Sequence, residues 1–256
     1  MGKLIYKYSL NLSAKLDAFA YQRDAFDAIK DLDYAAIFHE QGLGKTKIAI
    51  DLLLYWLQEC DIDTVLIVTK KQLVKNWENE LAIHTFIKSS TLNSNKRDNY
   101  FIFNSPARIV ITNFETISSE RMRVELFAKS RNTAIIIDES TKIKNPDSKL
   151  TKDFFYLAPL FKKRVIMTGT PVANRPYDIW AQIYFLDFGA SLGENFAAFK
   201  SNTDLSNDMT ENDSIRDFFE STVASIYDKI RNFAVRETKK SGIISLPNKV
   251  YSNVVA

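Results

Sequence analysis

The sequence has 256 residues, of which 46% are hydrophobic and 25% are charged, and its formal net charge is only +3. This length suffices for one large domain or two small ones, and the small net charge means that any basic surface arises from local clustering. The single cysteine, Cys60, excludes an intrachain disulfide. No apolar stretch reaches the roughly 20 residues of a membrane span, and no secretory leader is recognisable, so we expect a cytoplasmic protein with no membrane partner.

Apolar residues follow helical and strand-like patterns in alternation through the first two thirds of the chain. They predict a helix over 17–32 and a strand over 34–38. Further strands are predicted over 64–69, 108–112, 133–138 and 164–168, and further helices over 45–57, 72–83 and 148–161. Segment 88–99 is rich in Ser, Asn and Lys and is predicted to be a surface loop. Strands that are apolar throughout and alternate with helices predict an α/β fold with a central, mostly parallel sheet covered on both faces.

The pattern changes after Trp180. Helices are predicted over 181–186, 195–200 and 213–232, and the tail over 236–256 is basic and then extended. We therefore expect three parts: an α/β lobe over 1–180, a helical extension over 181–235 packed on the same lobe, and a linker over 236–256. Ligands of such sheets bind at the carboxyl ends of the strands.

A glycine loop joins the first predicted strand to the helix that follows it. The loop runs from Glu40 through Gln41, Gly42, Leu43, Gly44 and Lys45 to Thr46. Such a loop presents backbone amides and a positive helix end to a phosphate chain, with the lysine reaching the β- and γ-phosphates and the threonine hydroxyl binding Mg²⁺. His39 stands where the full pattern has its first glycine, so a tight turn that caps a helix is the alternative.

Two later segments also directly follow apolar strands. Asp138 and Glu139 end the strand over 133–138, where one carboxylate can hold Mg²⁺ and the next can polarise a water molecule. A helix N-cap is the alternative. Thr168, Gly169 and Thr170 follow the strand over 164–168 and can form a hydrogen-bonded switch beside the carboxylates, with a Pro/Gly turn as the alternative.

Taken in order, these segments resemble the motifs of the superfamily-2 helicase-like ATPases, which include the DEAD/DEAH-like proteins, and most of all the Swi/Snf-type translocases. The residues that carry the resemblance are Gln22 and the segments over 40–46, 65–77, 110–115, 138–145, 168–174, 185–188, 196–199, 235–240 and 246–249. The resemblance implies a three-layer, RecA-like P-loop NTPase lobe that uses ATP and Mg²⁺.

The resemblance also implies a role for individual residues. Gln22 would recognise adenine, Lys45 and the loop amides would bind the phosphates, and Asp138 with Glu139 would hold Mg²⁺ and the attacking water. Thr168, Gly169 and Thr170 would couple nucleotide state to movement. The residues expected along the backbone of double-stranded DNA are Lys70, Lys71, Gln72, Thr112 and Asn113, and a solvated face is the alternative for the two lysines.

Two departures from the family pattern bear on function. Many members have a histidine where Thr141 stands, and threonine cannot carry a charge. Such motors also have a second RecA-like lobe that supplies arginines to the γ-phosphate, and nothing after Arg236 is long enough to form one. We therefore expect this chain to be the first lobe of a longer polypeptide, of bacterial or phage origin, and to hydrolyse ATP slowly by itself.

Two alternatives remain open. The first is a restriction-type DNA motor or an RNA helicase lobe of the same superfamily, but the run 142–145 and the tail over 235–240 favour the Swi/Snf type. The second is a non-catalytic nucleotide- or nucleic-acid-binding module. The presence of Lys45, Thr46, Asp138 and Glu139 together argues against it, because a scaffold does not require a carboxylate that activates water.

Overall fold

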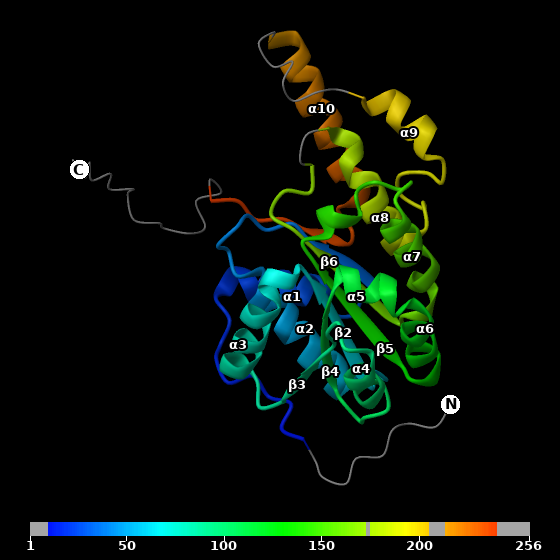
Figure 1. Ribbon diagram of the computed structural model, residues 1–256. Coiled ribbons are helices and arrows are strands. Elements are labelled where there is room, and N and C mark those ends of the chain that lie inside the picture. The colour runs from blue at the N-terminus through cyan, green and yellow to red at the C-terminus, as the bar shows by residue number, and fades with distance from the viewer. Residues whose placement is uncertain (1–9, 173–174, 205–212, 240–256) are drawn as a thin grey trace, which may run out of the picture.

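A seven-stranded sheet forms the centre of the computed structural model, which describes residues 10–172, 175–204 and 213–239. The strands lie in the order β3-β4-β2-β5-β6-β1-β7, and every neighbouring pair is parallel. Their bounds are β1 (Tyr34–Ile37), β2 (Thr64–Thr69), β3 (Ser89–Thr91), β4 (Ile109–Asn113), β5 (Thr133–Asp138), β6 (Lys163–Met167) and β7 (Ala234–Val235). The predicted α/β class with a central parallel sheet is confirmed (Figure 1).

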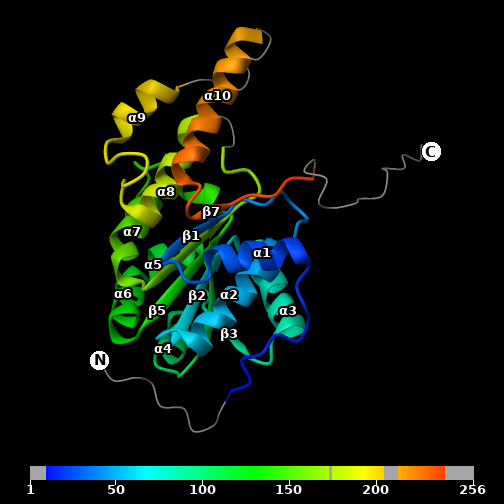
Figure 2. The same cartoon turned by 180° about the vertical axis from the view of Figure 1, so that it is seen from behind.

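Helices cover both faces of this sheet, as the two opposite views in Figures 1 and 2 show. One face carries α1 (Ala20–Ile29), α2 (Lys45–Glu59) and α3 (Val74–His84). The other face carries α4 (Lys96–Phe103), α5 (Phe114–Ser119), α6 (Arg121–Ser130), α7 (Lys149–Leu157), α8 (Trp180–Asp187) and α10 (Asp213–Ile230), with α9 (Phe196–Thr203) beside α8. Successive strand residues alternate between the two cores, so that Ile67 faces α1–α3 and Val68 faces the opposite helices.

The register of the strands aligns their carboxyl ends. Ile37 of β1 lies opposite Met167 of β6, which lies opposite Asp138 of β5. Val68 of β2 lies opposite Ile137, so the end of β2 is beside the same edge. The segments that follow these strands are therefore brought to one edge of the sheet, although more than 100 residues separate the first from the last.

The prediction of a surface loop over 88–99 is wrong. Ser89–Thr91 forms β3, which pairs in parallel with β4, and α4 begins at Lys96. Three polar residues form an edge strand here because β4 offers its free edge, which no local pattern signals. Leu92, directly after β3, is buried and its amide donates to the carbonyl of Ile111.

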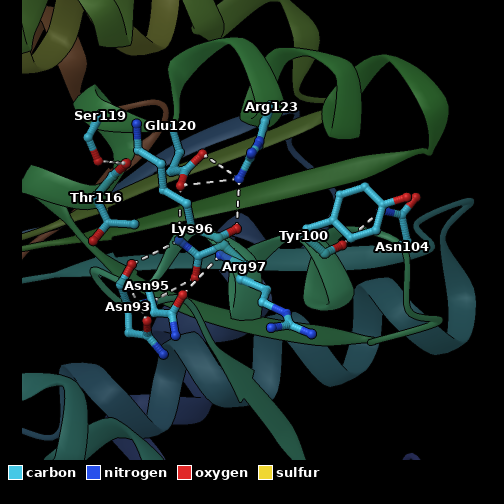
Figure 3. A network of polar contacts seen from close by, with 11 residues as sticks. Asn93, Asn95, Lys96, Arg97, Tyr100, Asn104, Thr116, Ser119, Glu120 and Arg123 are labelled. Atoms are coloured by element: carbon cyan, nitrogen blue, oxygen red, sulfur yellow. Dashed lines mark hydrogen bonds and ion pairs between the residues drawn. The ribbon is translucent and has the colours of Figure 1, made fainter.

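Side-chain hydrogen bonds fix the start of α4 (Figure 3). The side chain of Asn95 accepts a hydrogen bond from the amide of Arg97, which is an N-cap contact. Arg123 on α6 donates to the carbonyl of Lys96 at 2.8 Å and pairs with Glu120 at 3.2 Å. The polar composition that suggested a loop is thus used for capping and for tying α4 to α6.

The residues after Trp180 pack on the same lobe. Seven of the eight residues of α8 are buried, and the helix contacts β6 and β1. Ile226 and Ile230 of α10 are buried in the same core, and β7 then extends the sheet by pairing with β1. No helix among the described residues combines the length and the apolar character needed to cross a membrane.

Candidate nucleotide site

The loop between β1 and α2 is shaped by two glycines in the left-handed region. Gly42 has φ +85°, and Gly44 has φ +67° and is the N-cap of α2. Residues other than glycine rarely adopt these φ angles. Leu43 is buried between them and anchors the loop in the lobe. The loop therefore turns its backbone toward the open edge, where the amides at the start of α2 can bind an anion.

Lys45 lies at the base of this loop. Its ammonium group donates to the carbonyl of His39 at 3.0 Å and lies 3.4 Å from that of Glu40. Burial lowers the pKa of Lys45, while the nearby carboxylates of Asp138 and Glu139 act to raise it. The lysine is thus held over the loop by weak neutral acceptors, and a phosphate would be a stronger partner.

Gln22 closes the loop from the α1 side. Its carbonyl oxygen accepts a hydrogen bond from the Phe19 amide at 2.9 Å, and its amide nitrogen packs on Gly44. A Cβ added to Gly44 would lie only 2.0 Å from that nitrogen, so the close approach requires glycine. Gln22 is 4% exposed. Its position beside the phosphate loop would suit a hydrogen bond to the base of a nucleotide bound there.

A cleft of about 590 Å³ joins these residues to the carboxylates. The predicted residues that line it are Gln22, Gln41, Gly42, Gly44, Lys45, Thr46, Asp138 and Glu139. One face of α3 forms another wall, where Asn76, Glu80 and His84 follow at intervals of four. Helical spacing of four places these three side chains in one row. The other lining residues are Leu16, Asp17, Phe19, Lys47, Leu73 and Met167.

Asp138 is oriented by two hydrogen bonds to one of its oxygens. The Thr69 hydroxyl donates to Oδ2 at 3.0 Å, and the Trp77 indole N–H donates to the same atom at 2.9 Å. Burial raises the pKa of Asp138, and these two donors act against that rise. Both side-chain donors use Oδ2, and a hydrogen bond from the backbone of Glu139 also acts to lower the pKa of this carboxyl group.

Glu139 adopts a left-handed backbone, with φ +58°. This conformation is uncommon for a non-glycine residue and turns the chain sharply after β5. Its carboxylate pairs with Lys70 at 3.0 Å, and both side chains are about one third exposed. An ion pair with this exposure is readily exchanged for another partner.

The residues present fit Mg²⁺ held together with a nucleotide. Thr46 and Asp138 line the same cleft, and Mg²⁺ typically takes one or two carboxylates and completes its shell with phosphate and water oxygens. No group of three or more His, Cys, Asp or Glu side chains forms a metal cage within the described part of the chain. A nucleotide phosphate would therefore have to supply part of the coordination shell.

The segment after β6 contacts the phosphate loop. A Cβ added to Gly169 would lie 3.2 Å from the amide nitrogen of Gln41 and 3.5 Å from the ammonium group of Lys45. Thr168 is fully buried, and its hydroxyl accepts a hydrogen bond from the Thr170 amide at 3.2 Å. The last two residues of the predicted motif, 173–174, lie outside the described residues.

Gln182 is a bridging residue that the sequence did not reveal. This α8 side chain is fully buried, accepts a hydrogen bond from the Ser140 hydroxyl at 2.7 Å and donates to the Pro171 carbonyl at 3.0 Å. It therefore links the segment after Asp138 to the segment after β6. Trp77 ends the run over 65–77 that carries the family resemblance, but it was given no site role, because with Leu73 and Leu81 it follows the spacing of an ordinary core stripe.

The residues expected to contact DNA do not all lie at the surface. Lys71 and Gln72 are exposed in the short 3₁₀ turn that precedes α3, and Lys70 is paired with Glu139. Asn113 caps α5 by accepting a hydrogen bond from the Thr116 amide. Thr112 is fully buried in β4, which argues against a DNA contact by its side chain, and the expected contact stays a prediction.

The described end of the chain passes the phosphate loop. The amide of Glu40 donates to the carbonyl of Glu237 at 2.9 Å, and the Lys239 amide donates to the Glu40 carboxylate. The predicted linker over 236–256 is described only as far as Lys239, and residues 240–256 lie outside the described residues.

Comparisons with known proteins agree with this architecture. The family model of the SNF2-related domain matches residues 34–255. The chain is 30% identical to the transcription regulatory protein SNF2 of Saccharomyces cerevisiae, in a match that covers 82% of this chain and 13% of that protein. It is 26% identical to an uncharacterized ATP-dependent helicase of Mycoplasma pneumoniae, in a match that covers 91% of this chain and 22% of that protein.

A solved structure shows the same fold. The Sulfolobus solfataricus SWI2/SNF2 ATPase core, solved in complex with double-stranded DNA, superposes with a TM-score of 0.70 at 22% identity. The match covers 95% of this chain and 48% of that one, so the chain spans about half of the solved core and a smaller part of the curated relatives. The fold is the RecA-like fold of that core, and the chain belongs to the SNF2-related domain family.

Proposed function

We propose that this chain is the ATP- and Mg²⁺-binding motor lobe of a Swi/Snf-like ATPase that translocates on double-stranded DNA. One observation carries the proposal: the phosphate loop, Lys45 and two adjacent carboxylates line one cleft at the carboxyl edge of the sheet. Family membership supports this assignment, since relatives include proteins named as ATP-dependent helicases.

In this proposal each residue of the cleft has a distinct task. The amides over 42–46 and the ammonium group of Lys45 bind the phosphates, and Gln22 reads the adenine edge. Thr46 and Asp138 would hold Mg²⁺, which when bound would neutralise charge on the phosphates. Glu139 polarises the attacking water and shares its carboxylate with Lys70.

Coupling between nucleotide and movement would run through contacts that already exist. Gly169 packs on Gln41 and Lys45, so a change in the loop displaces the segment after β6. Gln182 joins that segment to Ser140, next to the carboxylates. This route does not require a charged side chain at Thr141.

Different observations support the proposals that the lobe tracks along DNA and that it works with a second lobe. Lys70, Lys71 and Gln72 follow β2 at the edge that carries the cleft, and phosphate contacts by such side chains suit tracking without sequence preference. The solved relative is a core in complex with double-stranded DNA, and this chain covers about half of it. We propose that the lobe over 1–180, with the extension over 181–235, works with a second RecA-like lobe joined through the linker.

Hydrolysis assays test this proposal. In a polypeptide that contains both lobes, ATP turnover should rise with duplex DNA more than with single strands or RNA, and Glu139→Gln should abolish it. The 256-residue chain alone should turn over slowly, because arginines supplied in trans contribute roughly 10³- to 10⁵-fold in other phosphoryl-transfer systems. Stimulation by RNA alone would favour an RNA helicase, and unchanged turnover in Glu139→Gln would favour a non-catalytic module.

A further inference from the structure

We propose that Trp77 is a positioning residue for the metal site: its indole N–H holds Oδ2 of Asp138 so that Oδ1 is presented to Mg²⁺. The inference rests on the proposed function and assigns a task to a residue of α3 that is not among those lining the cleft. The hydrogen bond is 2.9 Å long and joins residues 61 positions apart in the sequence.

The hydrogen bond between Trp77 and Asp138 is shielded from water, and only Trp77 can be its donor. Trp77 is 1% exposed and Asp138 is 7% exposed, so water has little access to the bond. Tryptophan can only donate, and an ionised carboxylate can only accept, so the pair has one possible polarity. Hydrogen bonds with one ionised partner are shorter and stronger than neutral ones.

The choice of oxygen atom determines what remains for the cation. Thr69 donates to the same Oδ2 at 3.0 Å, so two donors converge on one oxygen from β2 and from α3. A carboxylate held at one oxygen by two donors cannot rotate freely. Contacts that orient a metal ligand in this way typically affect metal affinity by about 10- to 100-fold.

Trp77 also ends a segment that links Asp138 to the exposed residues Lys71 and Gln72. Thr69 and Trp77 delimit a continuous segment that contains Lys70, whose ammonium group pairs with Glu139. One segment therefore holds the carboxylates of both Asp138 and Glu139. The same segment contains the exposed residues Lys71 and Gln72.

The test is the substitution Trp77→Phe, which removes the donor and keeps most of the buried ring. ATP binding to the 256-residue chain is measured by isothermal titration calorimetry with Mg²⁺ and again with EDTA. We expect the affinity in Mg²⁺ to fall about 10-fold or more, and the affinity in EDTA to change by less than about 3-fold. Thr69→Val removes the second donor and should act in the same direction.

Trp56→Phe is the matched control. Trp56 is also 1% exposed, belongs to the same core and donates its indole N–H to the carbonyl of Lys30 at 3.3 Å. Its substitution should lower thermal stability without changing the ratio of the two ATP affinities. Circular dichroism checks the folding of each variant, and Thr69→Val decides the question if Trp77→Phe does not fold.

The outcomes separate this inference from the proposed function. If the wild-type chain binds ATP more tightly with Mg²⁺ and Trp77→Phe keeps the same Mg²⁺ dependence, the positioning role is refuted and the motor assignment stands. An equal fall of affinity with and without Mg²⁺ would also refute it, because packing alone would explain that result. If the wild-type chain binds no ATP, both the proposed function and this inference fail.

Discussion

Gln182 provides a quantitative test of the link between the two segments that flank the cleft. The substitution Gln182→Leu keeps the volume of the side chain but leaves the Ser140 hydroxyl and the Pro171 carbonyl without their partner. Each buried polar group left unpaired costs about 1–3 kcal/mol. For these two groups we therefore expect the free energy of unfolding to fall by about 2–6 kcal/mol.

A double-mutant cycle isolates the shared hydrogen bond. Ser140→Ala leaves one oxygen of Gln182 unpaired, whereas the double variant Ser140→Ala/Gln182→Leu removes both partners of that bond. The double variant should be less destabilised than the sum of the single variants by about 1 kcal/mol, since contacting residues are not additive.

The assay is equilibrium urea unfolding followed by far-UV circular dichroism. Gln58→Leu is the control: Gln58 is exposed on α2, so its substitution should change the free energy of unfolding by less than about 0.5 kcal/mol. Additivity within about 0.3 kcal/mol for Ser140 and Gln182 would refute the bridge as an energetic link.

Three further outcomes are expected at and beside the cleft. Gly44→Ala should lower ATP affinity at least 10-fold, because the φ of Gly44 is +67° and the new Cβ would clash with Gln22. Gly193→Ala is the control: Gly193 has φ +84° and open space around it, so the substitution should cost about 1–2 kcal/mol of stability without changing ATP affinity. Lys70→Gln should weaken binding of labelled duplex DNA in fluorescence anisotropy and reduce the slope of log affinity against log salt by about 1, and an unchanged slope would exclude a phosphate contact. Thr112→Val should leave DNA affinity unchanged and stability equal or higher in urea unfolding, because this buried hydroxyl has no hydrogen-bond partner; a loss of DNA affinity would restore Thr112 to the interface.

The sequence predicted the sheet well where strands are apolar throughout. The runs over 64–69 and 133–138 are β2 and β5, since fully buried strands of a parallel sheet have no polar face to interrupt the pattern. It failed for β3 and β7, which are short and exist because a neighbouring strand offers an edge. It also placed residues 96–99 in a surface loop and assigned nothing to the rest of α4, whose start is fixed by a polar cap.

The candidate site shows the same division. The loop residues and carboxylates were found because each group directly follows an apolar strand, and parallel register brings such positions to one edge. Trp77 and Gln182 were given no site role, because their hydrogen bonds join elements distant in sequence and their local pattern is that of core residues. Burial argues against a DNA contact by Thr112, which the resemblance of motifs alone had placed along DNA.

The central claim is that the cleft binds ATP through Lys45. Equilibrium dialysis of labelled ATP in Mg²⁺ against the wild-type chain, Lys45→Ala and the exposed-site control Lys75→Ala tests it directly. The account predicts saturable one-to-one binding by the wild type and by Lys75→Ala, with affinity at least 10-fold weaker in Lys45→Ala, because a charge-assisted hydrogen bond to phosphate is lost. Equal affinity in all three proteins, or no binding by the wild type, would contradict it.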